Sequence, residues 1–126
     1  MPSTLFKPFN VYIKDPENQY AKALPFEYVL CLTSFKYLVP TSRANVFVIP
    51  LLPGRTYHVG DSLRLPIIND GANDLRLPSD YSMAIDLMQP LPEEMLVPHS
   101  QGEILESEKD ELERFINAFL PFQERR

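Results

Sequence analysis

The sequence predicts a small, mostly β domain that closes with one amphipathic helix, arranged as an SH3-like, partly open barrel. Three observations support this fold class. Thirteen prolines punctuate the chain, short runs of branched and aromatic residues lie between them, and a helical period occurs only near the C-terminus. The length of 126 residues fits a single domain that spans positions 1–126.

Several apolar runs are expected to be strands, because they are rich in β-branched and aromatic residues and are bounded by turn-forming ones. They cover residues 9–13, 26–32, 45–52, 62–68 and 81–88. The run 45–52 is the most apolar and is predicted to be the central strand. Pro50 has no amide hydrogen, so this strand should end, bulge or reach an edge there. Pro90 and Pro92 are expected to end the last strand.

A helix is predicted from Glu108 to Leu120. Its apolar residues recur at i, i+3, i+4 and i+7 and so form one stripe that should bury against the barrel: Leu112, Phe115, Ile116 and Phe119. Ser107 is the expected N-cap, with Asp110 in the capping-box position. Pro121 cannot continue the helix and is expected to stop it.

The charge distribution favours a protein partner over a nucleic acid. Residues 1–85 have a net charge of +1, whereas residues 86–126 have a net charge of −6. Nucleic-acid binders usually present a basic patch that displaces counterions from phosphate, and the sequence shows no such patch. No apolar run approaches the ~20 residues that cross a bilayer, and the N-terminal residues do not resemble a secretory signal. A cytoplasmic protein without a membrane segment is therefore expected.

The residues that could bind a metal or act as a nucleophile are few and scattered. Cys31 is the only cysteine and lies in an apolar run, so it is expected to be an inert core thiol. His58 and His99 are the only histidines, and no Cys/His cluster has metal-ligand spacing, so neither a metal nor a cofactor is expected. His58 and Arg55 share a polar loop that could position a phosphate, although such loops are more often simply solvated.

Several segments, taken together, resemble the CcdB family of bacterial toxins. These segments are Phe9-x-Val11-Tyr12, Tyr28-Val29-Leu30-Cys31-Leu32-Thr33-Ser34, Val46-Phe47-Val48-Ile49-Pro50-Leu51, Pro66-Ile67-Ile68 and the helix from Ser107 to Phe119. That family opens on a Phe-x-Val-Tyr strand, continues with Val-Asp-Val-Gln-Ser and Val-Ile-Pro-Leu strands, and ends with a helix. The resemblance extends over about residues 9–122.

This resemblance implies a toxin of a type II toxin–antitoxin module, a homodimer with a cognate antitoxin, that poisons DNA gyrase by binding the gyrase A protein. In that family the gyrase contact is a C-terminal Trp-Gly-Ile. The present chain has no tryptophan and continues past the helix to Arg126. Phe122 is then the implied aromatic anchor, with Pro121 and Phe119 beside it in the sequence.

The second half of the chain also resembles the MazF/PemK endoribonucleases, which belong to the same superfamily. Asp86 matches their strand aspartate. A ribonuclease site acting on RNA would then combine Asp86 with Arg55 and His58, or with Arg43. In those enzymes an arginine near the aspartate stabilises the charge that develops at the scissile phosphate. Here the strand neighbours of Asp86 include no basic residue.

Three functions therefore stay open. The leading one is a gyrase-poisoning toxin that acts by protein–protein binding and is not an enzyme. The second is an endoribonuclease. The third is a non-toxic relative that keeps the barrel as an interaction module, because fold analogy alone does not determine function.

Overall fold

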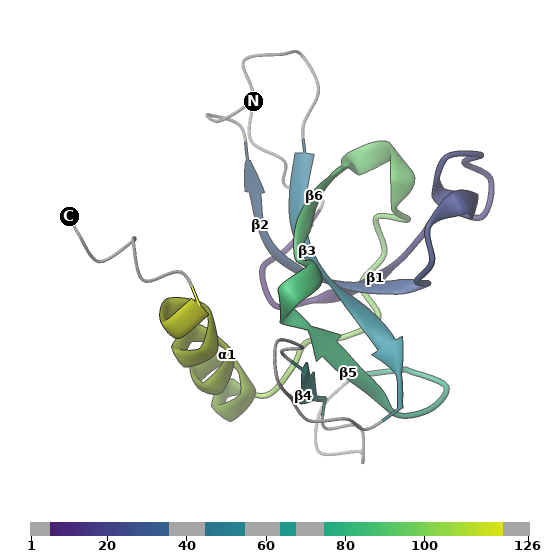
Figure 1. Cartoon of the computed structure of the whole chain (residues 1–126). Coiled ribbons are helices and arrows are strands. Elements are labelled where there is room, and N and C mark those ends of the chain that lie inside the picture. The colour runs from purple at the N-terminus through teal and green to yellow at the C-terminus, as the bar shows by residue number, and fades with distance from the viewer. Residues whose placement is uncertain (1–5, 36–44, 55–63, 68–74, 120–126) are drawn as a thin grey trace.

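The computed structural model describes residues 6–35, 45–54, 64–67 and 75–119. Within them, six strands form one open antiparallel sheet, and a helix follows (Figure 1). The elements in chain order are β1 (Val11–Ile13), η1 (Ala21–Ala23), β2 (Tyr28–Phe35), β3 (Asn45–Pro53), β4 (Arg64–Pro66), β5 (Tyr81–Ala84), η2 (Ile85–Leu87), β6 (Gln89–Pro92), η3 (Glu93–Met95) and α1 (Glu106–Phe119), where η denotes a 3-10 turn. The predicted class, mostly β with a C-terminal α-helix, is confirmed.

β3 is the central strand of the sheet, as the apolar run 45–52 predicted. β2 pairs along one edge of β3, and β1 continues the sheet beyond β2. The other edge of β3 is shared, since β5 pairs with its C-terminal half and β6 with its N-terminal half. β4 continues the sheet beyond β5. The order β1-β2-β3-β5-β4 thus brings the first and second halves of the chain together along β3.

Pro50 lies inside β3, which continues through it. The interruption expected at this proline falls instead on the segment that pairs with one edge of β3, between β5 and β6. The ladder with β2 continues past Pro50. On the other edge, the ladder to β5 stops at Leu51↔Met83 and the ladder to β6 starts at Val48↔Gln89, with η2 between them. A proline nitrogen has no hydrogen to donate. The segment between β5 and β6 therefore gives up no hydrogen bond from Pro50 when it leaves the sheet at this position.

The last predicted strand, residues 81–88, is wrong in its second half. β5 ends at Ala84, and Asp86 lies in the η2 turn. Pro90 and Pro92, which were expected to end the strand, lie within β6. Among the described strands β6 pairs only with β3, so prolines without amide hydrogens are tolerated on its free edge.

Both faces of the sheet are buried, each by its own group of apolar side chains. Neighbouring residues of a strand point to opposite faces, so Leu30 belongs to one group and Cys31 to the other. The helix-side core, which α1 covers, consists of Val11, Tyr28, Leu30, Ile49, Leu51, Leu65, Ile67, Leu77, Tyr81, Met83, Ile85, Ile104 and Leu112. The far-side core consists of Phe6, Tyr12, Phe26, Val29, Cys31, Val46, Val48, Leu91 and Leu96.

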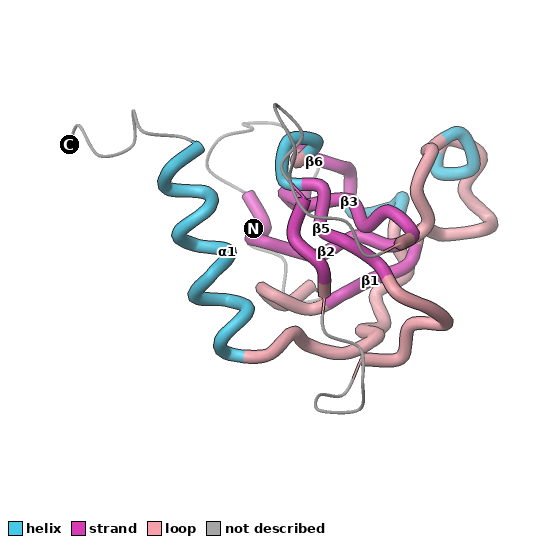
Figure 2. Tube along the Cα trace, turned by 60° about the horizontal axis from the view of Figure 1, so that its bottom comes forward, coloured by secondary structure: helices cyan, strands magenta, loops and turns pink. Residues whose placement is uncertain are grey.

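The helix α1 lies along one side of the sheet (Figure 2). Leu112 is fully buried in the helix-side core, and Phe115 and Ile116 pack against it half-buried, as the apolar stripe predicted. The backbone of Phe119 ends the helix, while its side chain lies outside the described part of the structure.

The predicted start of the helix is wrong by one half-turn. α1 begins at Glu106, so the residue before it, Leu105, occupies the N-cap position. The amide of Leu105 donates a hydrogen bond of 2.9 Å to the buried carboxylate of Glu108. A glutamate at the third helical position that accepts from the N-cap amide is one half of a capping box. Ser107 therefore lies exposed in the first turn and does not cap the helix.

Candidate functional site

The implied partner-binding residues lie at the C-terminal end of α1. Phe122 and Pro121 fall outside the described residues, and only the backbone of Phe119 is described. The structure therefore describes the helix that precedes this segment in the sequence, together with the contacts that fix that helix to the sheet.

A cluster of polar contacts fixes the first turns of α1. The Lys109 ammonium donates to the carboxylates of Glu103, at 2.5 Å, and of Glu106, at 3.3 Å. It also lies 5.5 Å from the centroid of the Phe9 ring, within range of a cation–π contact. The hydrogen bond to Glu103 raises the pKa of Lys109, and Glu106 adds to this effect. These contacts join the helix to the start of β1.

Phe9, beneath Lys109, has an unusual backbone conformation. Its φ is +65°, the only positive φ of a non-glycine residue in the described part of the chain. A bulky residue in this region is uncommon and must be held there by its surroundings. The Phe9 amide donates to the carbonyl of Cys31 at 2.6 Å, and its carbonyl accepts from the amide of Ile104 at 3.2 Å. Ile104 lies two residues before α1, so its hydrogen bond to Phe9 links the start of the helix to this constrained residue.

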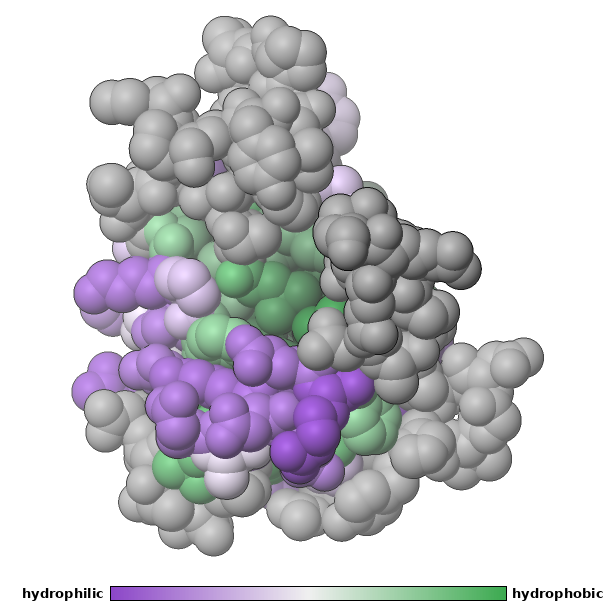
Figure 3. Space-filling model, turned by 90° about the vertical axis from the view of Figure 1, so that its left-hand side faces the viewer, coloured by the Kyte–Doolittle hydropathy of each residue, from purple (hydrophilic) through white to green (hydrophobic). Residues whose placement is uncertain are grey.

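The outward face of α1 is polar. The exposed residues in its first three turns are Glu106, Ser107, Asp110, Glu111, Glu113 and Arg114. Figure 3 shows a hydrophilic band, in purple, across one face of the molecule and an apolar area, in green, directly beside it.

Asp86 lies beside an arginine that the sequence analysis did not pair with it. The guanidinium of Arg64, on β4, forms an ion pair and hydrogen bond with the Asp86 carboxylate. Both side chains are largely buried, at 18% and 20% exposure. Asp86 has no basic residue beside it in the sequence, and the cation that faces it comes from a separate strand, β4. Its placement in a turn agrees with a structural carboxylate.

The sequence contained a signal for this pair. Residues 62–68 and 81–88 were both predicted to be strands. Had they been paired with each other, Arg64 would have come within a few residues of Asp86. The observed register places Arg64 opposite Ala84, two positions before Asp86. Arg55, His58 and Arg43, the other implied ribonuclease residues, lie outside the described residues.

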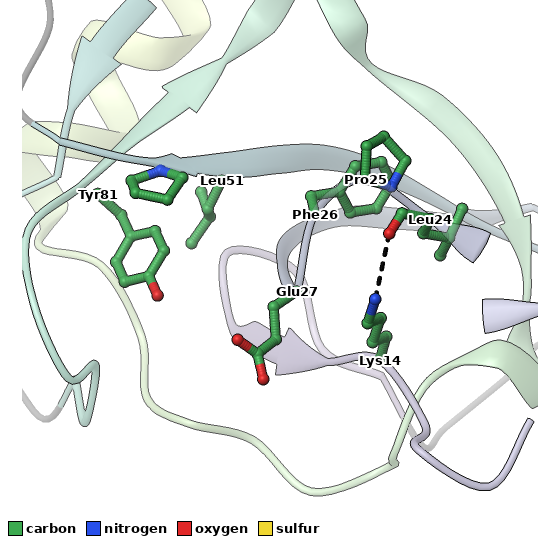
Figure 4. Close-up of a pocket in the computed structure, with 8 residues that line it drawn as sticks. Lys14, Leu24, Pro25, Phe26, Glu27, Leu51 and Tyr81 are labelled. Carbon is green, nitrogen blue, oxygen red and sulfur yellow. Dashed lines mark hydrogen bonds between the residues drawn. The ribbon is translucent and has the colours of Figure 1, made fainter. Parts of the chain in front are cut away.

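A hollow of about 430 Å³ opens where β1, β2, β3 and β5 approach one another (Figure 4). The side chains that line it were not singled out from the sequence: Lys14, Leu24, Pro25, Phe26, Glu27, Leu51, Pro53 and Tyr81. The Lys14 ammonium donates a hydrogen bond of 3.1 Å to the carbonyl of Leu24. The hollow combines an apolar floor with a few polar groups, which is the usual composition of a small-ligand site.

A second hollow, of about 370 Å³, lies on the far side and is lined by Phe6, Asp15, Glu93, Glu94, Leu96 and Pro98. Glu94 is exposed, but Oε2 of Glu93 is buried and has no hydrogen-bond partner in the described structure. No three His, Cys, Asp or Glu side chains of the described ranges converge in a way that could hold a metal ion.

Cys31 is an inert core thiol, as predicted. Its side chain is fully buried in the far-side core. Burial raises the pKa of the Cys31 thiol from 9.0 to about 12. Only the thiolate is nucleophilic, so this cysteine is unreactive at neutral pH.

Comparisons with known proteins identify no relative of this chain. No protein-family model matches it, and neither a curated protein nor a solved structure matches it. In the described residues, no helix has both the length and the apolar character needed to cross a membrane.

Proposed function

We propose that this protein is a CcdB-like toxin of a type II toxin–antitoxin module, which poisons DNA gyrase by protein–protein contact. The finer fold, an SH3-like and partly open barrel, belongs to this proposal, as do the homodimer and the cognate antitoxin. The observation that carries the proposal is the attachment of α1. Leu112, the Glu108 cap and the Lys109 cluster fix the helix that ends at Phe119, and Pro121 and Phe122 follow it in the sequence.

The secondary structure supports the resemblance on which the proposal rests. The segment that matches the family's Val-Ile-Pro-Leu strand, residues 46–51, lies in the central strand β3. Of the segments that match its first two strands, the first overlaps β1 through Val11 and Tyr12 and the second lies in β2, and these two strands pair with one another. The segment that matches the closing helix is α1. A largely acidic helix face beside an apolar area also favours a protein partner.

An endoribonuclease is the second candidate, and the Arg64–Asp86 pair is the observation that favours it. An arginine beside the aspartate is the arrangement that was missing from the sequence. However, a largely buried ion pair compensates the charge of both groups, so neither is free to stabilise a phosphoryl transition state. The pair is better explained as a contact that holds β4 against η2.

Induced expression in a bacterium tests the proposal. The wild-type protein should arrest growth and cause gyrase-dependent DNA breaks. Phe122→Ala should abolish both effects, because an interface anchor typically loses about 2 kcal/mol or more of binding free energy on truncation, which is over tenfold in affinity. Its thermal midpoint should match the wild type. Gln123→Ala, one position further along the chain, is the matched control and should remain toxic.

The other outcomes of this experiment select the alternatives. Cleaved transcripts with intact DNA would support the endoribonuclease. No growth arrest at matched expression would support the non-toxic interaction module. A strictly monomeric mass at micromolar concentrations would count against both toxins, since closed symmetric dimers are expected of them.

A further inference from the structure

The 430 Å³ hollow has walls that are held in place by both cores. Leu51 and Tyr81 belong to the helix-side core, whereas Phe26 belongs to the far-side core. All three are buried. The Tyr81 ring also packs edge-to-face against Tyr28, with ring centroids 5.2 Å apart. Because these side chains are fixed by packing on their other sides, the hollow is preformed, and its volume falls within the range of small-ligand sites.

The charged groups of this hollow are arranged in an unexpected way. The amide of Lys14 donates to the carbonyl of Glu27 at 2.9 Å, so the two residues are neighbours across the β1–β2 ladder. Oppositely charged cross-strand neighbours commonly form an ion pair. Here the Lys14 ammonium turns to the carbonyl of Leu24 instead. The exposed Glu27 carboxylate forms no ion pair with any residue that the structure describes.

The remaining polar group is the Tyr81 hydroxyl. Figure 4 shows this hydroxyl and the Glu27 carboxylate pointing to the same side of the hollow, below Leu51. The Lys14 ammonium points the other way, toward Leu24. The side of the hollow near Tyr81 therefore combines a negative charge and a hydroxyl oxygen with the exposed apolar ring of Pro53.

We propose that this hollow binds a primary ammonium group carried on a short aromatic or branched aliphatic body. The ammonium would donate to the Glu27 carboxylate and the Tyr81 hydroxyl, while the apolar body packs against the exposed Pro25 and Pro53. A free amine and the N-terminal residue of a peptide share this chemistry. The inference does not depend on the proposed toxin function, because it uses neither α1 nor the segment after it.

Titration of the isotope-labelled, full-length protein with phenethylamine, followed by amide NMR shifts, tests the inference. Phenethylamine should give saturable shifts around Glu27, with a dissociation constant of about 1 mM, since an exposed ion pair contributes little. 3-Phenylpropionate has the same aromatic body with the opposite charge and should give none. Glu27→Gln should weaken phenethylamine binding by about 2–5-fold. The matched control Glu17→Gln, at an exposed carboxylate outside the hollow, should leave it unchanged.

Two further measurements complete the test. Tyr81→Phe keeps the ring and removes the hydroxyl, so it should also weaken phenethylamine binding without unfolding the protein. Comparison of phenethylamine with the peptide Phe-Gly-Gly-amide distinguishes the two sources, because the tighter of the two identifies the natural type of ligand. Equal shifts from the amine and the acid, no saturable shift from either amine, or an unchanged affinity in Glu27→Gln would overturn the inference.

Discussion

The two faces of the sheet are covered by different kinds of structure. The helix-side core is covered by α1, whose Leu112 is fully buried. The far-side core is covered by chain outside helices and strands, which contributes Phe6, Phe26 and Leu96. The buried face of a helix can be recognised in the sequence by apolar residues that recur with the helical period, whereas the apolar residues of an irregular segment have no regular spacing. The helical cover could therefore be predicted from the sequence, and the irregular cover could not.

Backbone hydrogen bonds hold part of the irregular cover in place. The segment that contains Leu96 runs along the edge of β1 that does not pair with β2. The amide of Val97 donates to Ile13 at 3.0 Å, and the amide of Gln101 donates to Val11 at 2.7 Å. These bonds satisfy an edge that would otherwise be open to pairing with another chain. The segment is thus anchored by its backbone, while α1 is anchored mainly by its side chains.

The largest effect is expected from truncating the helix-side anchor. Leu112→Ala should lower the free energy of unfolding by about 4 kcal/mol, near the upper end for a buried leucine, because neighbours on the sheet cannot follow the shortened side chain. Chemical denaturation at neutral pH measures it. Glu113→Ala, next in sequence and exposed, is the control and should change stability by less than about 0.5 kcal/mol. Similar values for the two variants would mean that α1 is not docked as described.

The same truncation on the far side should cost less. Leu96 is also buried, but it lines the 370 Å³ hollow, so part of its surroundings is already empty. Leu96→Ala should cost about 2 kcal/mol, near the lower end of the range, because an irregular segment can shift to fill the space. The same denaturation assay compares the two leucines. A larger loss for Leu96→Ala than for Leu112→Ala would reverse the comparison between the faces.

Breaking the Arg64–Asp86 pair should have a smaller effect. Asp86→Asn keeps the shape of the side chain and an oxygen that accepts from Arg64, and removes only the charge, so stability should fall by about 1 kcal/mol although the pair is largely buried. Any growth arrest should persist, since the carboxylate is proposed to hold β4 and not to take part in catalysis. Asp80→Asn, at an exposed position, controls for the loss of one negative charge. Complete loss of toxicity in a folded Asp86→Asn protein would revive the endoribonuclease.

The elements that sequence reasoning predicted are those with a strong local pattern. β2, β3 and α1 follow from runs and periods that span one segment each. β6 was missed because Pro90 and Pro92 are penalised in any strand, and their tolerance depends on the sheet edge being free. The capping by Glu108 was missed because the more favourable cap residue, Ser107, stands one place earlier.

The contacts of the candidate sites could not be predicted for a different reason. Arg64 and Asp86 are 22 positions apart, and their contact depends on the register of β4 against β5. The 430 Å³ hollow is lined by four separate stretches of the chain, and it exists only because these stretches pack against one another. Local patterns carry little information about such long-range geometry, whereas a one-residue slip in register would change every contact.

The far-side core also contains the group that should make stability depend on pH. The Cys31 thiol is an acid whose pKa is raised from 9.0 to about 12 by burial, so the fold favours its neutral form. In the unfolded chain the thiol ionises near pH 9. Between these values the unfolded state gives up a proton that the native state keeps, and the free energy of unfolding therefore falls as pH rises.

The expected loss from this thiol between pH 9 and pH 10 is about 1 kcal/mol, and Cys31→Ala should lose that much less than the wild type over the same interval. Tyr12 and Tyr28 also have pKa values raised by burial, from 10.0, and their contribution is common to both proteins. Urea midpoints at pH 8, 9 and 10 for the two proteins isolate the thiol, because every other group titrates equally in both. Parallel loss in wild type and Cys31→Ala would show that water reaches Cys31. The irregular cover of the far face would then be looser than the helical cover opposite.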